Sequence, residues 1–179
     1  AEAIERGLVA VLAEARSHEH PVQPFTEEVR VRAARRGELE RDLRLAIAQD
    51  QFELFLQPKF NAASHRLVGA EALLRWRHPE RGLVGPDEFV PLAEEMGLIV
   101  PIGRWVLREG CRQAKAIQEL VPRQPPLTMS VNLSVKQLQH SDIVGDVREA
   151  LEDSGLAPEL LTLEITETVM MTDTDLAVQ

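Results

Sequence analysis

Four segments of this 179-residue chain each place an amide or a carboxylate side chain on one face of a strand-like pattern. These side chains are Gln57, Glu71, Asn132 and Glu164. Successive side chains of a strand point to opposite faces, so each segment offers one apolar face and one face with a polar group. The four residues fall near the carboxyl ends of their segments, where α/β barrels and open α/β sheets place their chemistry. The pattern therefore predicts one site built from several strands.

Glu71 and Arg75 lie on the same face of the second segment. The opposite face is wholly apolar and consists of Ala70, Ala72, Leu74 and Trp76. An unpaired buried carboxylate is costly enough to lose its charge, and a metal ion or an anionic ligand would remove that cost. The alternative is a salt bridge between Glu71 and Arg75 on an edge strand.

Strands and helices that would position these residues alternate along the chain. Asn132 and Glu164 are 32 residues apart (164 − 132), close to the roughly 31 residues per unit of an eight-unit barrel of about 250 residues. Apolar periodicity and end signals predict helices over residues 86–96, 100–120 and 142–154. The expected fold class is therefore α/β, of the barrel type.

Five motifs in this order resemble the EAL family of cyclic di-GMP phosphodiesterases. They are FELFLQPK, GAEALLRWRHP, PDEFVPLAEEMGLI, SVNLS and LEITET. The resemblance extends from about residue 52 to residue 172. It implies a TIM-like (β/α) barrel with one antiparallel strand, and hydrolysis of one phosphodiester of cyclic di-GMP to the linear dinucleotide pGpG.

The resemblance also implies roles for individual residues. Glu71, Asn132 and Glu164 match metal ligands for Mg²⁺ or Mn²⁺, with Glu71 and Glu164 counted as catalytic; oxygen ligands suit such hard cations. Three further residues match positions that line the ligand site: Gln57, Leu74 and Arg75.

The guanidinium fork of Arg75 can bind two phosphate oxygens. Strict alternation puts Leu74 and Arg75 on opposite faces, so we expect one of them to lie where the strand is already ending. Glu167 matches a position that steadies a loop, and the alternative for it is a solvated loop glutamate.

The chain departs from the family pattern beyond its fourth strand. The family's second half brings an Asp-Asp-Phe-Gly-type motif, a catalytic lysine and a later glutamate ligand, and none occurs before Gln179. The three lysines, Lys59, Lys115 and Lys136, do not lie in the context of the catalytic lysine. We therefore expect a fragment that holds about the first half of the barrel and about half of the metal site.

Composition limits the other functions. A net charge of −9 argues against general binding of DNA or RNA, which needs basic surface. No apolar run approaches the roughly 20 residues that span a bilayer, and no signal peptide is visible, so we expect a cytoplasmic protein. The single cysteine, Cys111, falls on the apolar stripe of a predicted helix, which favours a core residue over a nucleophile.

The region before the EAL-like motifs has its own organisation. Residues 1–26 resemble, weakly, the end of a GGDEF-like domain, and residues 27–50 predict a charged linker helix leading into the barrel. Residues 51–179 would then be the first half of the EAL domain.

Three functions remain open from the sequence. The first is an active phosphodiesterase in the complete domain, with the 179 residues alone inactive. The second is a degenerate domain that binds cyclic di-GMP as a receptor. The third is a structural or dimerising module, because half a barrel exposes sheet edges, and a homodimer is expected.

Overall fold

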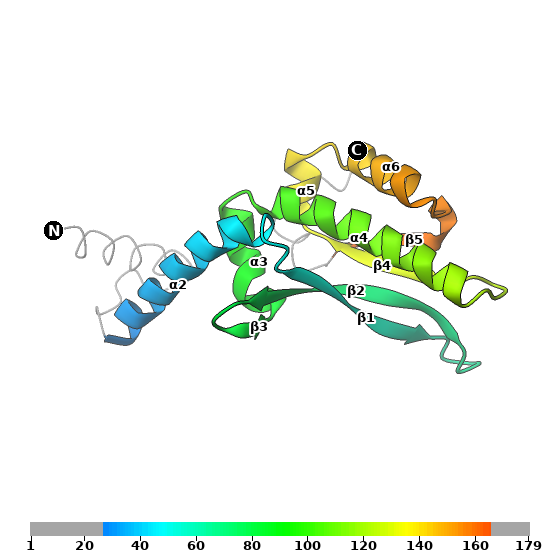
Figure 1. The fold of residues 1–179 in the computed structure, drawn as a ribbon, viewed down its shortest axis with the longest axis horizontal. Helices are drawn as coiled ribbons and strands as arrows, with labels where there is room; N and C mark the ends of the chain where they lie inside the picture. Colours follow the sequence, from blue (N-terminus) through cyan, green and yellow to red (C-terminus); the bar gives the residue numbers. More distant parts are fainter. Residues whose placement is uncertain (1–26, 166–179) are drawn as a thin grey trace. The chain divides into compact units, whose positions relative to one another are not determined.

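The computed structural model describes residues 27–165 (Figure 1). The chain divides into two compact units, residues 1–45 and 46–179. The described part of the first unit is nearly all of helix α2 (Glu27–Ala46). A helix was predicted over residues 27–50, and its role as a linker stays a prediction. The segment interpreted as a GGDEF-like remnant lies outside the described residues.

The second unit alternates strands and helices after an opening hairpin. Its elements are β1 (Phe52–Phe60), β2 (Leu67–His78), β3 (Gly82–Val84), α3 (Pro86–Glu95), α4 (Ile99–Leu120), β4 (Thr128–Leu133), α5 (Val135–His140), α6 (Ile143–Ser154), the 3-10 turn η1 (Pro158–Leu160) and β5 (Leu161–Ile165). The four predicted strands and three predicted helices are all confirmed. The short strand β3 and helix α5 were not predicted, because neither is long enough to show a period.

The strands form one sheet in the order β1-β2-β4-β5, with β3 beside β2. Strands β2, β4 and β5 run parallel, whereas β1 and β3 run antiparallel to β2. The parallel strands are joined by helical crossovers, as parallel pairing requires. The carboxyl ends of β2, β4 and β5 therefore point the same way.

Helix α4 covers the apolar face of the sheet, and α6 packs on α4 (Figure 1). Val131 of β4 lies under the helix at Gly110, where an added Cβ would meet Val131 Cγ2 at 3.2 Å. Cys111 is fully buried on this helix, as predicted for a core cysteine. Since this face holds the core, the opposite face of the sheet is left to the polar side chains.

An aromatic cluster closes the core where β1, β2, α3 and α4 meet. The ring of Phe52 lies 5.8 Å from Phe89 and 6.0 Å from Trp105, and Trp76 lies 5.7 Å from Phe89 in an edge-on geometry. The indole nitrogen of Trp76 donates to Gln51 Oε1 at 3.0 Å. The cluster anchors the far end of β2, beyond the residues of the predicted site.

Helix α5 begins directly after β4 and fixes the end of that strand. Ser134 is its N-cap and forms a capping box with the buried Gln137. The Ser134 hydroxyl also donates to Glu94 Oε1 of α3 at 2.6 Å. The carboxyl end of β4, which carries Asn132, is thus held to two helices.

Candidate functional site

The polar residues predicted from the sequence share one face of the sheet. The strand register pairs Gln57 with Glu71, Glu71 with Ser130, and Asn132 with Glu164. Residues paired across neighbouring strands point to the same face. The polar groups therefore form a continuous band over four strands, on the side of the sheet that α4 does not cover.

Glu71 and Asn132 are in direct contact. Asn132 Nδ2 donates to Glu71 Oε1 at 2.7 Å. Glu71 lies next to Ala72, the last residue of β2 that pairs with β4. The two residues therefore meet near the carboxyl end of the ladder between β2 and β4, although Glu71 lies well before the predicted position at the carboxyl end of β2, which runs on to His78.

Glu164 is held by a cation from β1, the strand at the opposite end of the strand order. Lys59 Nζ of β1 donates to Glu164 Oε1 of β5 at 2.6 Å and to Ser130 Oγ of β4 at 2.8 Å. The hydrogen bond from Lys59, assisted by one from Ser130, lowers the pKa of the Glu164 carboxyl below its ordinary range, although partial burial opposes the shift. Glu164 is therefore a charged group at neutral pH.

Arg75 is engaged away from Glu71. Its Nη1 donates to the carbonyl oxygen of Leu74 at 2.8 Å, and its guanidinium lies over the ring of Phe55, 5.7 Å from the centroid. Within residues 27–165 no ion pair joins Glu71 and Arg75, so the salt-bridge alternative does not describe this arrangement. The guanidinium keeps donors available for a ligand on the polar face.

Leu74 lies on the opposite face from Arg75. The pairing between β1 and β2 is continuous from Trp76 to Gly69, so alternation holds through Leu74, which pairs with Leu54. The expectation that the strand is already ending here is wrong for β2 itself, which runs to His78 because β1 and β3 still pair with it. The Leu74 side chain therefore lies away from the polar face, while its carbonyl oxygen accepts a hydrogen bond from Arg75 Nη1.

The two remaining predicted site residues are Gln57 and Glu167. Gln57 is exposed at the register position next to Glu71, and no side-chain hydrogen bond holds it within residues 27–165. Glu167 lies outside the described residues, and its role in a loop stays a prediction.

Glu71, Asn132 and Glu164 fit a divalent cation by their chemistry. All three offer oxygen atoms from neighbouring strands on one face, and Mg²⁺ and Mn²⁺ prefer such ligands. The Lys59 ammonium is a positive charge already seated against Glu164. In the described part of the chain no three acidic, histidine or cysteine side chains gather as a metal cluster, so the Asn132 amide would have to contribute.

Sequence reasoning did not assign Lys59 and Ser130 to the site. Both lie on the polar faces of their strands, two residues from Gln57 and Asn132 respectively, and this spacing is the signal that could have found them. What the spacing could not show is that Lys59 crosses β2 to reach β4 and β5. Its register partner is Gly69, which has no side chain to obstruct that path.

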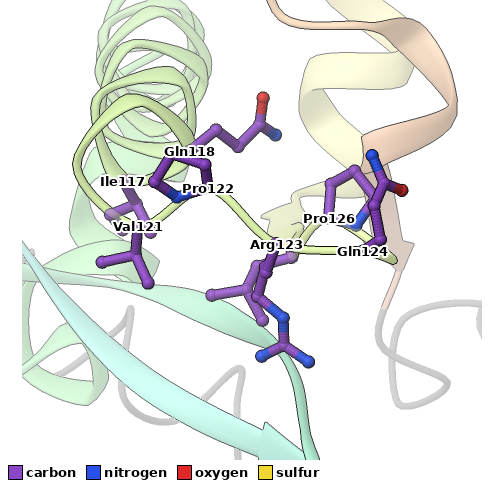
Figure 2. A pocket seen from close by; sticks show the side chains of 8 residues that line it. Ile117, Gln118, Val121, Pro122, Arg123, Gln124 and Pro126 are labelled. Atoms are coloured by element: carbon purple, nitrogen blue, oxygen red, sulfur yellow. The ribbon is translucent and has the colours of Figure 1, made fainter.

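A surface pocket lies at the other end of β4. Figure 2 shows it between the end of α4 and the segment before β4, lined by side chains between Ile117 and Leu127. It contains none of the predicted site residues. The pocket is therefore separate from the polar band.

Comparison with known proteins identifies the family. The EAL domain model matches residues 40–178. MucR of Pseudomonas aeruginosa, a bifunctional diguanylate cyclase/cyclic di-GMP phosphodiesterase, is 43% identical over 151 residues, which are 84% of this chain and 22% of MucR. The cyclic di-GMP phosphodiesterase NbdA of the same organism is 40% identical over 153 residues, 86% of this chain and 19% of NbdA. The chain thus spans about a fifth of the length of these curated relatives.

Solved structures give the same result for the fold. The PaMucR phosphodiesterase in its c-di-GMP complex superposes with a TM-score of 0.71 at 45% identity, over 77% of this chain and 55% of that one. The EAL enzyme Bd1971, bound to cAMP and cyclic di-GMP, has a TM-score of 0.71 at 33% identity, over 78% of this chain and 39% of its own. The sheet is accordingly part of a TIM-like barrel of the EAL type, with β1 antiparallel. The chain belongs to the EAL domain family.

Proposed function

We propose that this chain is part of a cyclic di-GMP phosphodiesterase that hydrolyses one phosphodiester of its substrate to pGpG. The observation that carries the proposal is the position of Glu71, Asn132 and Glu164 on one face of three adjacent parallel strands, β2, β4 and β5. The family supports it, because two similar relatives are named cyclic di-GMP phosphodiesterases.

The proposed roles follow from the chemistry of each side chain. Glu71, Asn132 and Glu164 would hold Mg²⁺ or Mn²⁺, which when bound can lower the pKa of a coordinated water and neutralise charge on phosphoryl oxygens. Arg75 would bind the phosphate through two donors, and its stacking on Phe55 would keep the guanidinium plane oriented. Gln57 would contact the substrate beside Glu71, from an exposed position with free donors and acceptors.

The isolated 179 residues should hydrolyse little or no cyclic di-GMP. They lack the Asp-Asp-Phe-Gly-type motif and the catalytic lysine of the family. Loss of a single electrostatic contact costs about 3 kcal/mol of transition-state stabilisation in a characterised site, and several are missing here.

The test is chromatographic detection of pGpG after incubation with cyclic di-GMP and Mn²⁺. A protein with a complete EAL domain should form pGpG, and Glu71→Ala should abolish it because a carboxylate ligand is lost. Turnover that persists unchanged in Glu71→Ala would show that the ligand assignment is wrong. Binding of cyclic di-GMP in calorimetry without any pGpG would instead identify a receptor.

Two further expectations belong to this proposal. We expect the protein to work in the cytoplasm, as a homodimer. Among the described residues no helix is both long and apolar enough to cross a bilayer.

A further inference from the structure

Lys59 is the charged residue of the polar band that the proposed function does not use. It starts on β1 and reaches over β2 to contact Ser130 on β4 and Glu164 on β5. Ser130 is buried, so one end of this arrangement is built into the sheet. The two arginines further along the same face of β2 are engaged elsewhere: Arg75 lies over Phe55, and Arg77 donates to Glu53 at 2.7 and 2.9 Å.

We propose that Lys59 competes with the divalent metal ion for the Glu164 carboxylate. The inference rests on the proposed function, because it takes Glu164 to be a metal ligand. Lys59 Nζ lies 2.6 Å from Glu164 Oε1, and Mg²⁺ or a similar ion would need that carboxylate at about 2.0–2.1 Å. An ammonium and a dication cannot both contact the same carboxylate oxygen at these short distances, because their charges repel.

Lys59 has room to leave Glu164 when a metal ion binds. Its side chain is 41% exposed, so the ammonium can turn toward water while Ser130 still accepts a hydrogen bond from it. The competition makes metal affinity lower than the three oxygen ligands alone would provide. It also keeps the Glu164 charge paired while no metal is bound.

The experiment measures Mn²⁺ affinity in the full natural protein that contains this chain, without cyclic di-GMP. Free Mn²⁺ is followed by its electron paramagnetic resonance signal. Lys59→Met and Lys59→Gln remove the competing charge and should tighten Mn²⁺ binding by roughly 1.5- to fivefold, the range that one partly exposed ion pair provides. Lys59→Arg keeps the charge and should bind Mn²⁺ like the unsubstituted protein.

Lys115→Met is the matched control. The Lys115 side chain is 38% exposed, a fraction similar to that of Lys59. Lys115 and its partner Glu119 both lie on helix α4, which covers the opposite face of the sheet. The substitution removes the same charge but should leave the Mn²⁺ affinity unchanged. An equal tightening in Lys115→Met would overturn the proposal, because a general charge effect would then explain the result.

The outcomes separate this inference from the proposed function. If Glu164→Gln weakens Mn²⁺ binding but Lys59→Met and Lys59→Gln do not tighten it, Lys59 is no competitor and the metal site stands. Weaker Mn²⁺ binding in Lys59→Met would show that the lysine positions Glu164 instead. If neither Glu71→Ala nor Glu164→Gln affects Mn²⁺ binding, the proposed metal site itself is wrong.

Discussion

Single side chains at the polar band differ in what balances their charge. Glu164 is paired with Lys59, whereas Glu71 accepts from the neutral amide of Asn132. Away from the band, burial raises the pKa of the Cys111 thiol to about 11, so this thiol stays protonated at neutral pH. The only cysteine of the chain is therefore a core residue, and the reactive groups lie on the other face of the sheet.

In the metal-free protein Glu164 should titrate below the range of an ordinary glutamate. Its folded pKa is lowered mainly by the hydrogen bond from Lys59, so the stabilisation is present above the ordinary pKa and is lost as the pH falls through the lowered value. Carboxyl ¹³C chemical shifts of Glu164 followed against pH will measure this.

Lys59→Met should move the Glu164 pKa back up toward the ordinary range. Lys115→Met, which breaks a pair on helix α4, should not move it. Identical Glu164 titration curves in the Lys59→Met and unsubstituted proteins would contradict the assigned cause.

At the scale of elements, the junction of β4 and α5 controls where Asn132 sits. Gln137 Oε1 accepts from the Ser134 backbone N–H at 3.0 Å, and α4 passes close by at Gly103. A Cβ on Gly103 would lie 1.7 Å from Gln137 Nε2, so only glycine allows this approach. Three consecutive helices of the chain, α3, α4 and α5, therefore meet at the end of the strand that carries Asn132.

Gly103→Ala should destabilise the second unit by about 1–3 kcal/mol, because the buried Gln137 must leave the capping box. Urea unfolding followed by tryptophan fluorescence reports on this unit, which contains both Trp76 and Trp105.

Gly37→Ala is the matched control for that substitution. Gly37 also lies inside a helix, α2, but nothing lies within 4 Å of an added Cβ. Because Gly37 lies in the first unit, the substitution should leave the unfolding of the second unit, which the tryptophans report, unchanged. Equal destabilisation by the two substitutions would show that the contact with Gln137 is not the cause.

At the scale of the whole molecule, the outer strands of the described sheet carry exposed apolar side chains. Phe55 and Phe60 lie on β1, and Leu163 and Ile165 lie on β5. Strand edges with such side chains favour pairing with another chain. This supports the expectation of a homodimer, which remains a prediction.

The 179-residue chain should sediment as a dimer at micromolar concentration, and Ile165→Lys should shift it toward monomer because a charge on an outer strand opposes pairing. Val144→Lys is the control, since Val144 is an exposed apolar residue, 64% accessible, on helix α6. Monomeric sedimentation of the unsubstituted chain would contradict the expected self-association.

The sequence by itself determined which faces of their strands the main polar side chains occupy. Alternation within a strand and periodicity within a helix depend only on local geometry, so the faces of Glu71, Asn132 and Glu164 followed from spacing. The helix ends followed in the same way, since Gly97 and Gly155 adopt the positive φ angles that end α3 and α6 (+71° and +66°). The order of the five motifs was sufficient to recognise the family.

Only the tertiary structure decided which of these faces touch. Strand order and direction arise from contacts between residues far apart in the chain, such as Lys59 with Glu164, and no local pattern encodes such a pairing. The structure placed β1 antiparallel beside β2, extended β2 past Arg75 and set Gly103 against Gln137. Lys59 could join the site because its neighbour on β2 is Gly69, a fact of register and not of local sequence.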